Sequence, residues 1–260
     1  MNRTALAVVL ALAVAIGLVF GLFPQLDMKI AAPFYVAGRH FLLGDVDWHT
    51  WLRDQAMFVV ALFAAPPIIV LVLKLIFPRR RMPISARAAV YLAVTFALAP
   101  GVLANGILKD HWPRSRPVDV QEFQGSERFT PWWDPRGDCT MNCSFVSGEA
   151  AGAYWLIAPA SLAPPQWRPL AYAAAVAFGT AVGLMRMAFG GHFFTDVVFA
   201  GVFTYLIIWT VHGLIYRWRP TRTSDEAIEN AIAAIPMAIM SPFRRNRPAD
   251  DKPGLPGRSP

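Results

Sequence analysis

The sequence has 260 residues, of which 55% are hydrophobic, and its formal net charge is +7. This composition excludes an ordinary soluble domain and indicates a protein with several membrane spans. The positive charge does not indicate a nucleic-acid-binding protein, because the basic residues cluster beside apolar runs, as signals of membrane topology do.

Six uncharged apolar runs are long enough to cross a bilayer, and they predict an all-α polytopic protein with six transmembrane helices. The first run is longer than the core of a signal peptide and lacks a convincing small-x-small cleavage site, which favours an uncleaved helix. In chain order the runs are Thr4 to Leu26, Gln55 to Leu73, Ala88 to Leu108, Ala150 to Trp167, Pro169 to Met185 and Val197 to Tyr216.

The segments between the runs predict the orientation of the protein. Residues 27–54 read as a mixed-charge loop, and a long polar loop extends from Lys109 to Val146. Six helices place both termini on one side, which then carries 15 of the 24 Lys and Arg residues but only 5 of the 17 Asp and Glu residues. By the positive-inside rule this side is cytoplasmic. The polar loop and the Arg186–His192 loop then share the opposite face.

The chain is therefore expected to have two parts, a six-helix membrane domain (residues 1–217) and a cytoplasmic tail (residues 218–260). Within the tail, residues 224–241 have apolar side chains at helical spacing after Ser224, a potential N-cap. This amphipathic segment is expected either to lie along the inner membrane surface or to pack against the bundle or a partner. From Pro242 onward the composition is typical of disorder.

The segment between the fifth and sixth runs combines a cation, two glycines, a histidine and a carboxylate. If the chain is helical after Gly191, His192 and Asp196 share one helix face. The carboxylate could then fix the imidazole tautomer and leave the other ring nitrogen as a nucleophile or base. Arg186 adds a permanently charged group suited to phosphate. A structural hydrogen bond at a helix start explains His192 and Asp196 about equally well.

Two further groups of polar residues border the long loop. Lys109 and Arg116 are seven residues apart and are followed by Pro117; alone, they indicate a basic juxtamembrane loop. Ser147 can cap the fourth helix, whose free N–H groups would make an anion site. An ordinary helix start, with Glu149 stabilised by the helix dipole, explains the same residues.

The two cysteines, Cys139 and Cys143, lie close together in the polar loop. In the cytoplasm they would be free thiols, but the predicted topology places them on the oxidising side, where a disulfide is reasonable. Such a bond closes a very short loop, so its expected benefit is local rigidity.

Together, the order Lys-x6-Arg-Pro, Ser-Gly and Arg-x5-His-x3-Asp is much more specific than any of its parts. It resembles the type 2 phosphatidic acid phosphatase (PAP2) superfamily, which also includes vanadium haloperoxidases and bacterial acid phosphatases. The resemblance covers roughly residues 50–217 and matches the six-helix membrane branch of that family. It implies a phosphatase that acts through a phosphohistidine and needs no metal or cofactor.

The resemblance also implies a role for each matching residue. His192 would attack phosphorus, and Asp196 would hold its imidazole in place. The phosphate oxygens would be bound by the cations and by the hydroxyl and backbone N–H groups of the second motif, which are Lys109, Arg116, Arg186, Ser147 and Gly148.

The second motif departs from the family, because it reads Val146-Ser147-Gly148-Glu149 where the usual pattern is Pro-Ser-Gly-His. The family's histidine protonates the leaving oxygen. A carboxylic acid can do so when partial burial raises its pKa, which makes Glu149 the first choice as proton donor. His111 is the reserve donor, although a role as an ordinary loop histidine is simpler, and impaired activity is a third alternative.

The sequence therefore predicts an integral membrane phosphatase of the bacterial inner membrane, with cytoplasmic termini and a periplasmic active site. Its expected partners are the bilayer and a lipid phosphomonoester or pyrophosphate. Phosphatidic acid, phosphatidylglycerol phosphate, isoprenyl pyrophosphate and lipid A all stay open as substrates. The alternatives are a phosphotransferase of the same fold and a non-catalytic lipid-phosphate binder or transporter, whereas the membrane spans argue against a haloperoxidase.

Overall fold

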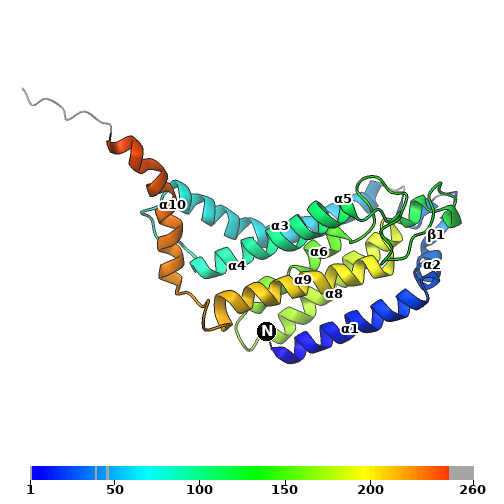
Figure 1. Cartoon of the computed structure of the whole chain (residues 1–260), viewed down its shortest axis with the longest axis horizontal. Coiled ribbons are helices and arrows are strands. Elements are labelled where there is room, and N and C mark those ends of the chain that lie inside the picture. Colours follow the sequence, from blue (N-terminus) through cyan, green and yellow to red (C-terminus); the bar gives the residue numbers. More distant parts are fainter. Residues whose placement is uncertain (1, 39, 45–46, 246–260) are drawn as a thin grey trace, which may run out of the picture.

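The computed structural model describes residues 2–38, 40–44 and 47–245 and shows a mostly helical chain, with most of its long helices side by side (Figure 1). In chain order the elements are α1 (Arg3–Leu22), α2 (Gln25–Ala31), η1 (Ala32–Phe34), β1 (Tyr35–Ala37), β2 (His40–Phe41), α3 (Asp47–Ile76), α4 (Ala86–Phe96), η2 (Ala97–Leu108), α5 (Lys109–His111), η3 (Pro117–Asp119), η4 (Gln121–Phe123), α6 (Gly148–Tyr154), α7 (Ile157–Ser161), α8 (Arg168–Ala188), α9 (Phe194–His212), η5 (Gly213–Arg217) and α10 (Asp225–Arg245).

Within these ranges, five helical segments are long and apolar enough to cross a membrane. They correspond to the first, second, third, fifth and sixth predicted runs. The all-α fold class is confirmed, with one small antiparallel hairpin, β1–β2, as the addition that the sequence did not indicate. The five segments are Arg3–Leu22, Thr50–Ile76, Ala86–His111, Arg168–Ala188 and Phe194–Arg217.

The fourth predicted run is not the single helix that its hydropathy indicates. It forms α6 and α7, which are separated by a turn at Trp155 and Leu156. Pro159 explains the break, because a proline lacks the N–H and clashes with the carbonyl four residues earlier. The two short helices still lead from the long polar loop to the start of α8.

The prediction of a mixed-charge loop at residues 27–54 is wrong in its details. It contains α2, the β1–β2 hairpin and the first turns of α3. The 30 residues of α3 extend for about 45 Å at 1.5 Å per residue. This length exceeds the hydrocarbon core of about 30 Å, so charged residues at its ends can stay in the headgroup layers. Polar composition therefore does not mark the start of this helix.

Aromatic side chains with satisfied polar groups form the centre of the bundle. Trp155 and Tyr91 are fully buried. The indole Nε1 of Trp155 donates a hydrogen bond to Thr95 Oγ1 at 2.9 Å, and the Tyr91 hydroxyl lies 2.9 Å from Ser161 Oγ. Because an unpaired buried polar group costs free energy, these bonds favour one packing of the α6–α7 segment against α4.

The two ends of the bundle differ in charge and in structure. Figure 1 shows the N-terminus and α10 at one end, and α2 with the β1–β2 hairpin at the other. At the first end, Arg3, Arg217 and Arg219 line one pocket, and Arg87 lies over the Tyr216 ring at 5.3 Å. The three sequence motifs lie at the second end. Basic residues that the sequence predicts as topology signals thus lie at the end of the bundle opposite to the motifs.

The tail segment predicted as amphipathic is helical and packs against the bundle. Its helix, α10, contacts α3 and α4. Lys74 Nζ lies 2.7 Å from Glu229 Oε1, and the Ser85 hydroxyl donates to Asp225 Oδ1. The helix continues to Arg245, past Pro242, where disorder was expected to begin. The rest of that expected disordered tail, residues 246–260, lies outside the described residues.

Replacing Glu229 with Gln removes the carboxylate that faces the buried amine of Lys74. We expect the free energy of unfolding to fall by about 1–3 kcal/mol, because a hydrogen bond between charged groups is lost while the ammonium stays buried. Thermal unfolding of the purified protein in detergent measures the loss. Glu226→Gln, an exposed change on the same helix, is the control. Equal stability of the two variants would contradict the assignment.

Candidate active site

The third motif lies where α8 ends and α9 begins. Arg186 belongs to the last turn of α8, Gly190 turns the chain at φ +68°, and Asp196 lies in the first turn of α9. His192 therefore precedes α9, which begins at Phe194. The shared helix face expected for His192 and Asp196 is not observed, although their side chains still approach each other.

The imidazole of His192 is buried and is held through Nδ1. This nitrogen donates a hydrogen bond to the Ser144 carbonyl oxygen at 2.7 Å, while Asp196 Oδ2 lies 4.0 Å away. A carbonyl oxygen can only accept, so Nδ1 carries the proton and Nε2 of the neutral ring is unprotonated. The direct partner of the ring is thus the Ser144 carbonyl, in place of the Asp196 carboxylate that the sequence motif implied.

Three cations act on His192 through space. Burial lowers the pKa of His192 most, and the charges of Arg186, Arg116 and Lys109 lower it further, to well below its usual value of 6.5. The imidazole is therefore neutral at neutral pH, which is the form in which Nε2 can attack an electrophile. The structure thus brings the histidine together with all three cations that the motifs predicted.

Glu149, the residue that departs from the family pattern, lies between two arginines. Its Oε2 is 3.4 Å from Nε of Arg186, and its Oε1 is 3.7 Å from Nε of Arg53. In the described part of the chain, both Nε atoms and Glu149 Oε2 are buried and form no hydrogen bond. The two Nε–H groups are therefore the donors in this cluster that can still bind the oxygens of a ligand.

The motifs do not indicate Arg53, which is far upstream of them and belongs to α3. Its one signal in the sequence is its position two residues before the second apolar run, where a cation would lie at the membrane surface. Whether that surface is the one with the motifs follows only from the predicted topology. Its contact with Glu149 could not be read from spacing.

The disulfide between Cys139 and Cys143 is present, and its loop contacts both ends of the first motif. Nε and Nη2 of Arg116 donate hydrogen bonds to the Asn142 carbonyl oxygen at 3.0 and 2.7 Å. The backbone N–H of Cys143 donates to the Lys109 carbonyl oxygen at 3.0 Å. The loop closed by the disulfide therefore connects the two cations.

Glycines of the second and third motifs allow polar side chains to approach the backbone. A Cβ on Gly148 would lie 2.4 Å from Oδ1 of Asn105, and a Cβ on Gly191 would lie 2.7 Å from Nη2 of Arg186. Ser147 is the N-cap of α6, as expected, and its Oγ accepts a hydrogen bond from a backbone N–H of the first turn at 3.4 Å. Larger residues at both glycines would displace groups of the site.

The Asp196 carboxylate is fully buried behind the imidazole and is bound by donors other than His192. Its Oδ2 accepts hydrogen bonds from the Ser144 hydroxyl at 2.6 Å and from the Phe193 N–H at 2.8 Å, and its Oδ1 accepts from Arg114. The Phe193 bond is the carboxylate half of a capping box at the start of α9. Ser144 therefore joins Asp196, through its hydroxyl, to His192, through its carbonyl.

The sequence does not indicate three buried residues of this site, which are Ser144, Arg114 and Asp27. Arg114 lies inside the Lys-x6-Arg spacing at a position that the motif leaves open, and Asp27 lies in the segment predicted as a loop. Nη2 of Arg114 is 2.7 Å from Oδ2 of Asp27. A buried charge has to be paired, but no sequence pattern names its partner at this separation.

His111, the reserve proton donor, is exposed. Its Nδ1 lies 3.0 Å from the Ile107 carbonyl oxygen of its own helical segment. This bond is typical of a histidine near a helix end, and a role for His111 in proton transfer stays a prediction.

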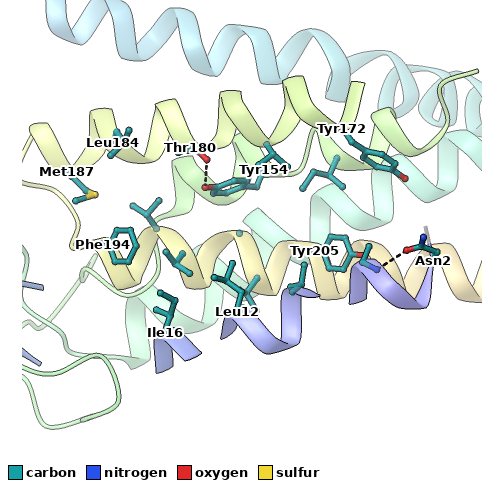
Figure 2. Close-up of a pocket in the computed structure, with 18 of the residues that line it drawn as sticks. Asn2, Leu12, Ile16, Tyr154, Tyr172, Thr180, Leu184, Met187, Phe194 and Tyr205 are labelled. Atoms are coloured by element: carbon teal, nitrogen blue, oxygen red, sulfur yellow. Dashed lines mark hydrogen bonds between the residues drawn. The ribbon is translucent and has the colours of Figure 1, made fainter. Parts of the chain in front are cut away.

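A groove of about 770 Å³ opens between α1, α8 and α9 (Figure 2). Its lining is mostly apolar and includes Leu12 of α1, Leu184 of α8 and Phe194 of α9. The Tyr154 hydroxyl lies 3.1 Å from Thr180 Oγ1, which satisfies two of the few polar groups in the wall. Because the groove follows membrane-spanning helices, it suits hydrocarbon chains better than polar ligands.

The arrangement as a whole can bind an anion and attack it. The three cations can neutralise the negative charge of an anionic ligand, and the neutral imidazole of His192 presents Nε2 as a nucleophile. Phosphoryl transfer needs mainly this combination of positioning and positive potential.

Comparison with known proteins gives the same assignment. The family model of the PAP2 superfamily matches residues 88–224, more than half of the chain. A lipid A 4'-phosphatase of Francisella tularensis subsp. novicida (strain U112) is 38% identical over 200 residues, which cover 76% of this chain and 90% of that protein. A lipid A 4'-phosphatase of Rhizobium leguminosarum is 33% identical over 193 residues, which cover 69% and 83%.

One solved structure was also matched, the crystal structure of a transmembrane PAP2 type phosphatidylglycerolphosphate phosphatase from Bacillus subtilis. It is 21% identical, has a TM-score of 0.49, and covers 83% of this chain and 98% of that chain. The match of the family model and the identity with the two phosphatases are decisive, and this chain belongs to the PAP2 superfamily.

Proposed function

We propose that this chain, a membrane lipid phosphatase, hydrolyses the 4'-phosphate of lipid A, or of a similar phosphorylated glycolipid, through a phosphohistidine. The two similar lipid A 4'-phosphatases support the substrate. The single observation that supports the route is the hydrogen bond from His192 Nδ1 to the Ser144 carbonyl, because it leaves Nε2 unprotonated beside three cations.

In the first step, the phosphate of the substrate binds Lys109, Arg116 and Arg186. It reaches Arg186 by displacing Glu149, since both anions need the same guanidinium. Nε2 of His192 then forms the N–P bond while the bond between phosphorus and the lipid oxygen breaks. The cations neutralise the charge that builds on the phosphoryl oxygens in the transition state.

Proton transfer falls to Glu149, which loses its partner Arg186 when the phosphate arrives and takes up the proton that the phosphate monoanion carries. It gives this proton to the leaving lipid oxygen. In the second step the carboxylate takes a proton from the water that attacks the phosphohistidine, and the N–P bond breaks. The released phosphate removes this proton, so Glu149 returns to its pairing with Arg186. The balance is one water consumed, with one lipid alcohol and one phosphate released. Asp196, 4.0 Å from Nδ1, stabilises the positive imidazole of the intermediate.

A non-catalytic lipid-phosphate binder is the second candidate. The ion pairs of Glu149 with Arg186 and Arg53 favour this candidate. A carboxylate that is paired with two guanidinium groups holds these cations in place and donates no proton. The orientation of His192 favours the enzyme, because a binder needs the cations but no nucleophile with a fixed tautomer.

We also infer that the site faces the periplasm of a bacterial inner membrane, with both termini in the cytoplasm. The support is the separation of the basic end of the bundle from the end with the motifs. The disulfide beside the first motif agrees with this orientation, because such bonds persist in oxidising compartments.

The direct test is phosphate release by the purified protein. We expect turnover of lipid A phosphorylated at the 4' position and little turnover of lipid A phosphorylated only at the 1 position or of phosphatidic acid. His192→Ala should lose activity by at least about a thousandfold, because it removes the nucleophile. Glu149→Gln should be slowed about 10²- to 10⁴-fold, the range for loss of a general acid. Glu226→Gln is the unchanged control.

Trapping of labelled enzyme separates the two candidate functions. Wild type, but not His192→Ala, should retain phosphate through an acid-labile bond after denaturation. Tight binding of the lipid without turnover and without labelled protein would establish the binder instead.

The pKa of His192 predicts the pH dependence of the reaction. Because only the neutral imidazole attacks, the acid limb of kcat/KM should lie below pH 6.5, the ordinary value for histidine. Arg116→Gln removes a positive charge that lowers this pKa, so the limb should move to higher pH. Arg136→Gln changes an exposed arginine paired with Asp134 and should leave it in place. A limb that stays put in Arg116→Gln would contradict the electrostatic account.

Loss of the disulfide should weaken the binding of phosphate by Lys109, Arg116 and Arg186 more than it lowers the stability of the fold. In the Cys139→Ser/Cys143→Ser double variant, Asn142 no longer holds Arg116 in one place, and we expect kcat/KM to fall by about tenfold, mainly through KM. Steady-state kinetics measures the change, and reduced wild type should behave like the variant. An unchanged KM would show that the loop does not orient Arg116.

A further inference from the structure

Asp27 lies on α2, outside the residues 88–224 that match the family, yet its side chain reaches the third motif. Only 1% of its surface is exposed. Its Oδ2 accepts hydrogen bonds from the Thr195 hydroxyl at 2.6 Å and from Nη2 of Arg114 at 2.7 Å, and its Oδ1 accepts from the Thr195 N–H at 3.1 Å. Burial of a carboxylate needs this degree of compensation.

The Arg114 guanidinium joins Asp27 to the catalytic segment. Its Nη1 donates to Asp196 Oδ1 and, at 2.8 Å, to Thr195 Oγ1, while its Nε donates to the Thr130 carbonyl at 3.0 Å. Donors on all three nitrogens are thus used, and the side chain is fully buried. In this orientation the planar guanidinium pairs with both carboxylates at once.

Thr195 fixes the direction of the hydrogen bonds that connect Arg114 to Asp27. Its hydroxyl has one hydrogen, which it donates to Asp27, and it accepts from Arg114 through its oxygen. Its backbone N–H is also bound by Asp27, so the first turn of α9 is fixed to α2. The next residue is Asp196, whose carboxylate binds Ser144, the residue that holds the His192 ring.

We propose that Asp27 is a positioning residue for His192. Acting through Arg114, Thr195 and Asp196, it fixes the direction of the imidazole and adds a second negative charge behind it. This inference rests on the proposed function, since it gives Asp27 a part in the reaction of His192.

The charge of Asp27 gives it an effect on catalysis beyond its effect on folding. Two carboxylates around the single cation Arg114 leave one net negative charge on the side of Asp196. His192 gains positive charge when it is phosphorylated, so this negative charge stabilises the intermediate. The other charges that face the ring lie on the phosphate side and are Lys109, Arg116 and Arg186, with Glu149 bound to the last of these.

Two isosteric changes test the proposal in the full-length protein. Asp27→Asn removes the charge but keeps the shape, and Thr195→Val removes the hydroxyl but keeps the shape. Thr195→Ser restores the hydroxyl and is the rescue variant. Glu229→Gln is the matched control for folding, because it also takes a carboxylate from a buried cation, at the opposite end of the bundle.

The first readout is kinetic. Asp27→Asn and Thr195→Val should lower kcat about 10- to 100-fold, the range for a misplaced reacting group. Here kcat is calculated per enzyme molecule that still binds vanadate, a phosphate analogue, so that unfolded protein is not counted. KM should stay within about threefold, because the phosphate side is untouched. Thr195→Ser and Glu229→Gln should keep the kcat of wild type. Loss of protein stability with unchanged kcat in the first two variants would overturn the proposal and reduce Asp27 to a structural brace.

The second readout does not depend on turnover. Nitrogen-15 NMR of labelled histidine reports the protonated nitrogen and the titration of His192. In Asp27→Asn the midpoint should move to lower pH, because a negative charge near the ring is gone, and in Thr195→Val the Nδ1–H signal should shift. Unchanged His192 signals in both variants would refute the coupling. If wild type turns over no lipid while these signals shift, the proposed function fails and the coupling stands.

Discussion

The pairing of one buried cation is the constraint on which the site depends. Arg114 is fully buried and cannot lose its proton, so the fold has to supply anions around it. It does so from two places far apart in the chain, Asp27 of α2 and Asp196 of α9. The requirement to neutralise Arg114 thereby connects α2, which follows the first membrane helix, to the start of α9. The direction of the His192 ring follows from this connection.

The sequence predicts well those features that follow from the local spacing of residues. It predicts poorly those that depend on contacts between distant parts of the chain. Hydropathy predicts the five helical segments that are long enough to span a membrane, but it does not reveal the break that Pro159 introduces in the fourth apolar run. The motif spacing predicts His192 and the three cations as a group, and the structure brings them together, because these residues lie close to the ends of helices. The partner of the ring was missed because α9 starts at Phe194. Spacing could not reveal that Arg53 meets Glu149, since their contact joins separate crossings of the bundle.

The balance of charge differs on the two sides of the imidazole. On the phosphate side, cations exceed anions, which suits a negatively charged ligand and keeps the ring neutral. On the opposite side, two carboxylates exceed one guanidinium, which suits a ring that becomes positive. Glu149 belongs to the first side and reduces its excess of positive charge until a ligand arrives. Glutamate in place of the histidine of the second motif therefore also changes the charge balance on the phosphate side.

The groove between α1, α8 and α9 bears on how the protein can be handled outside a membrane. Within a bilayer we expect hydrocarbon chains to occupy it, since water has few partners along such a lining. Lipid chains then contribute to the packing of α1 much as side chains do in a soluble core. A detergent with a tail too short to follow the groove would leave α1 less supported, and α1 leads directly into α2. The solubilising medium is in this sense a component of the folded enzyme.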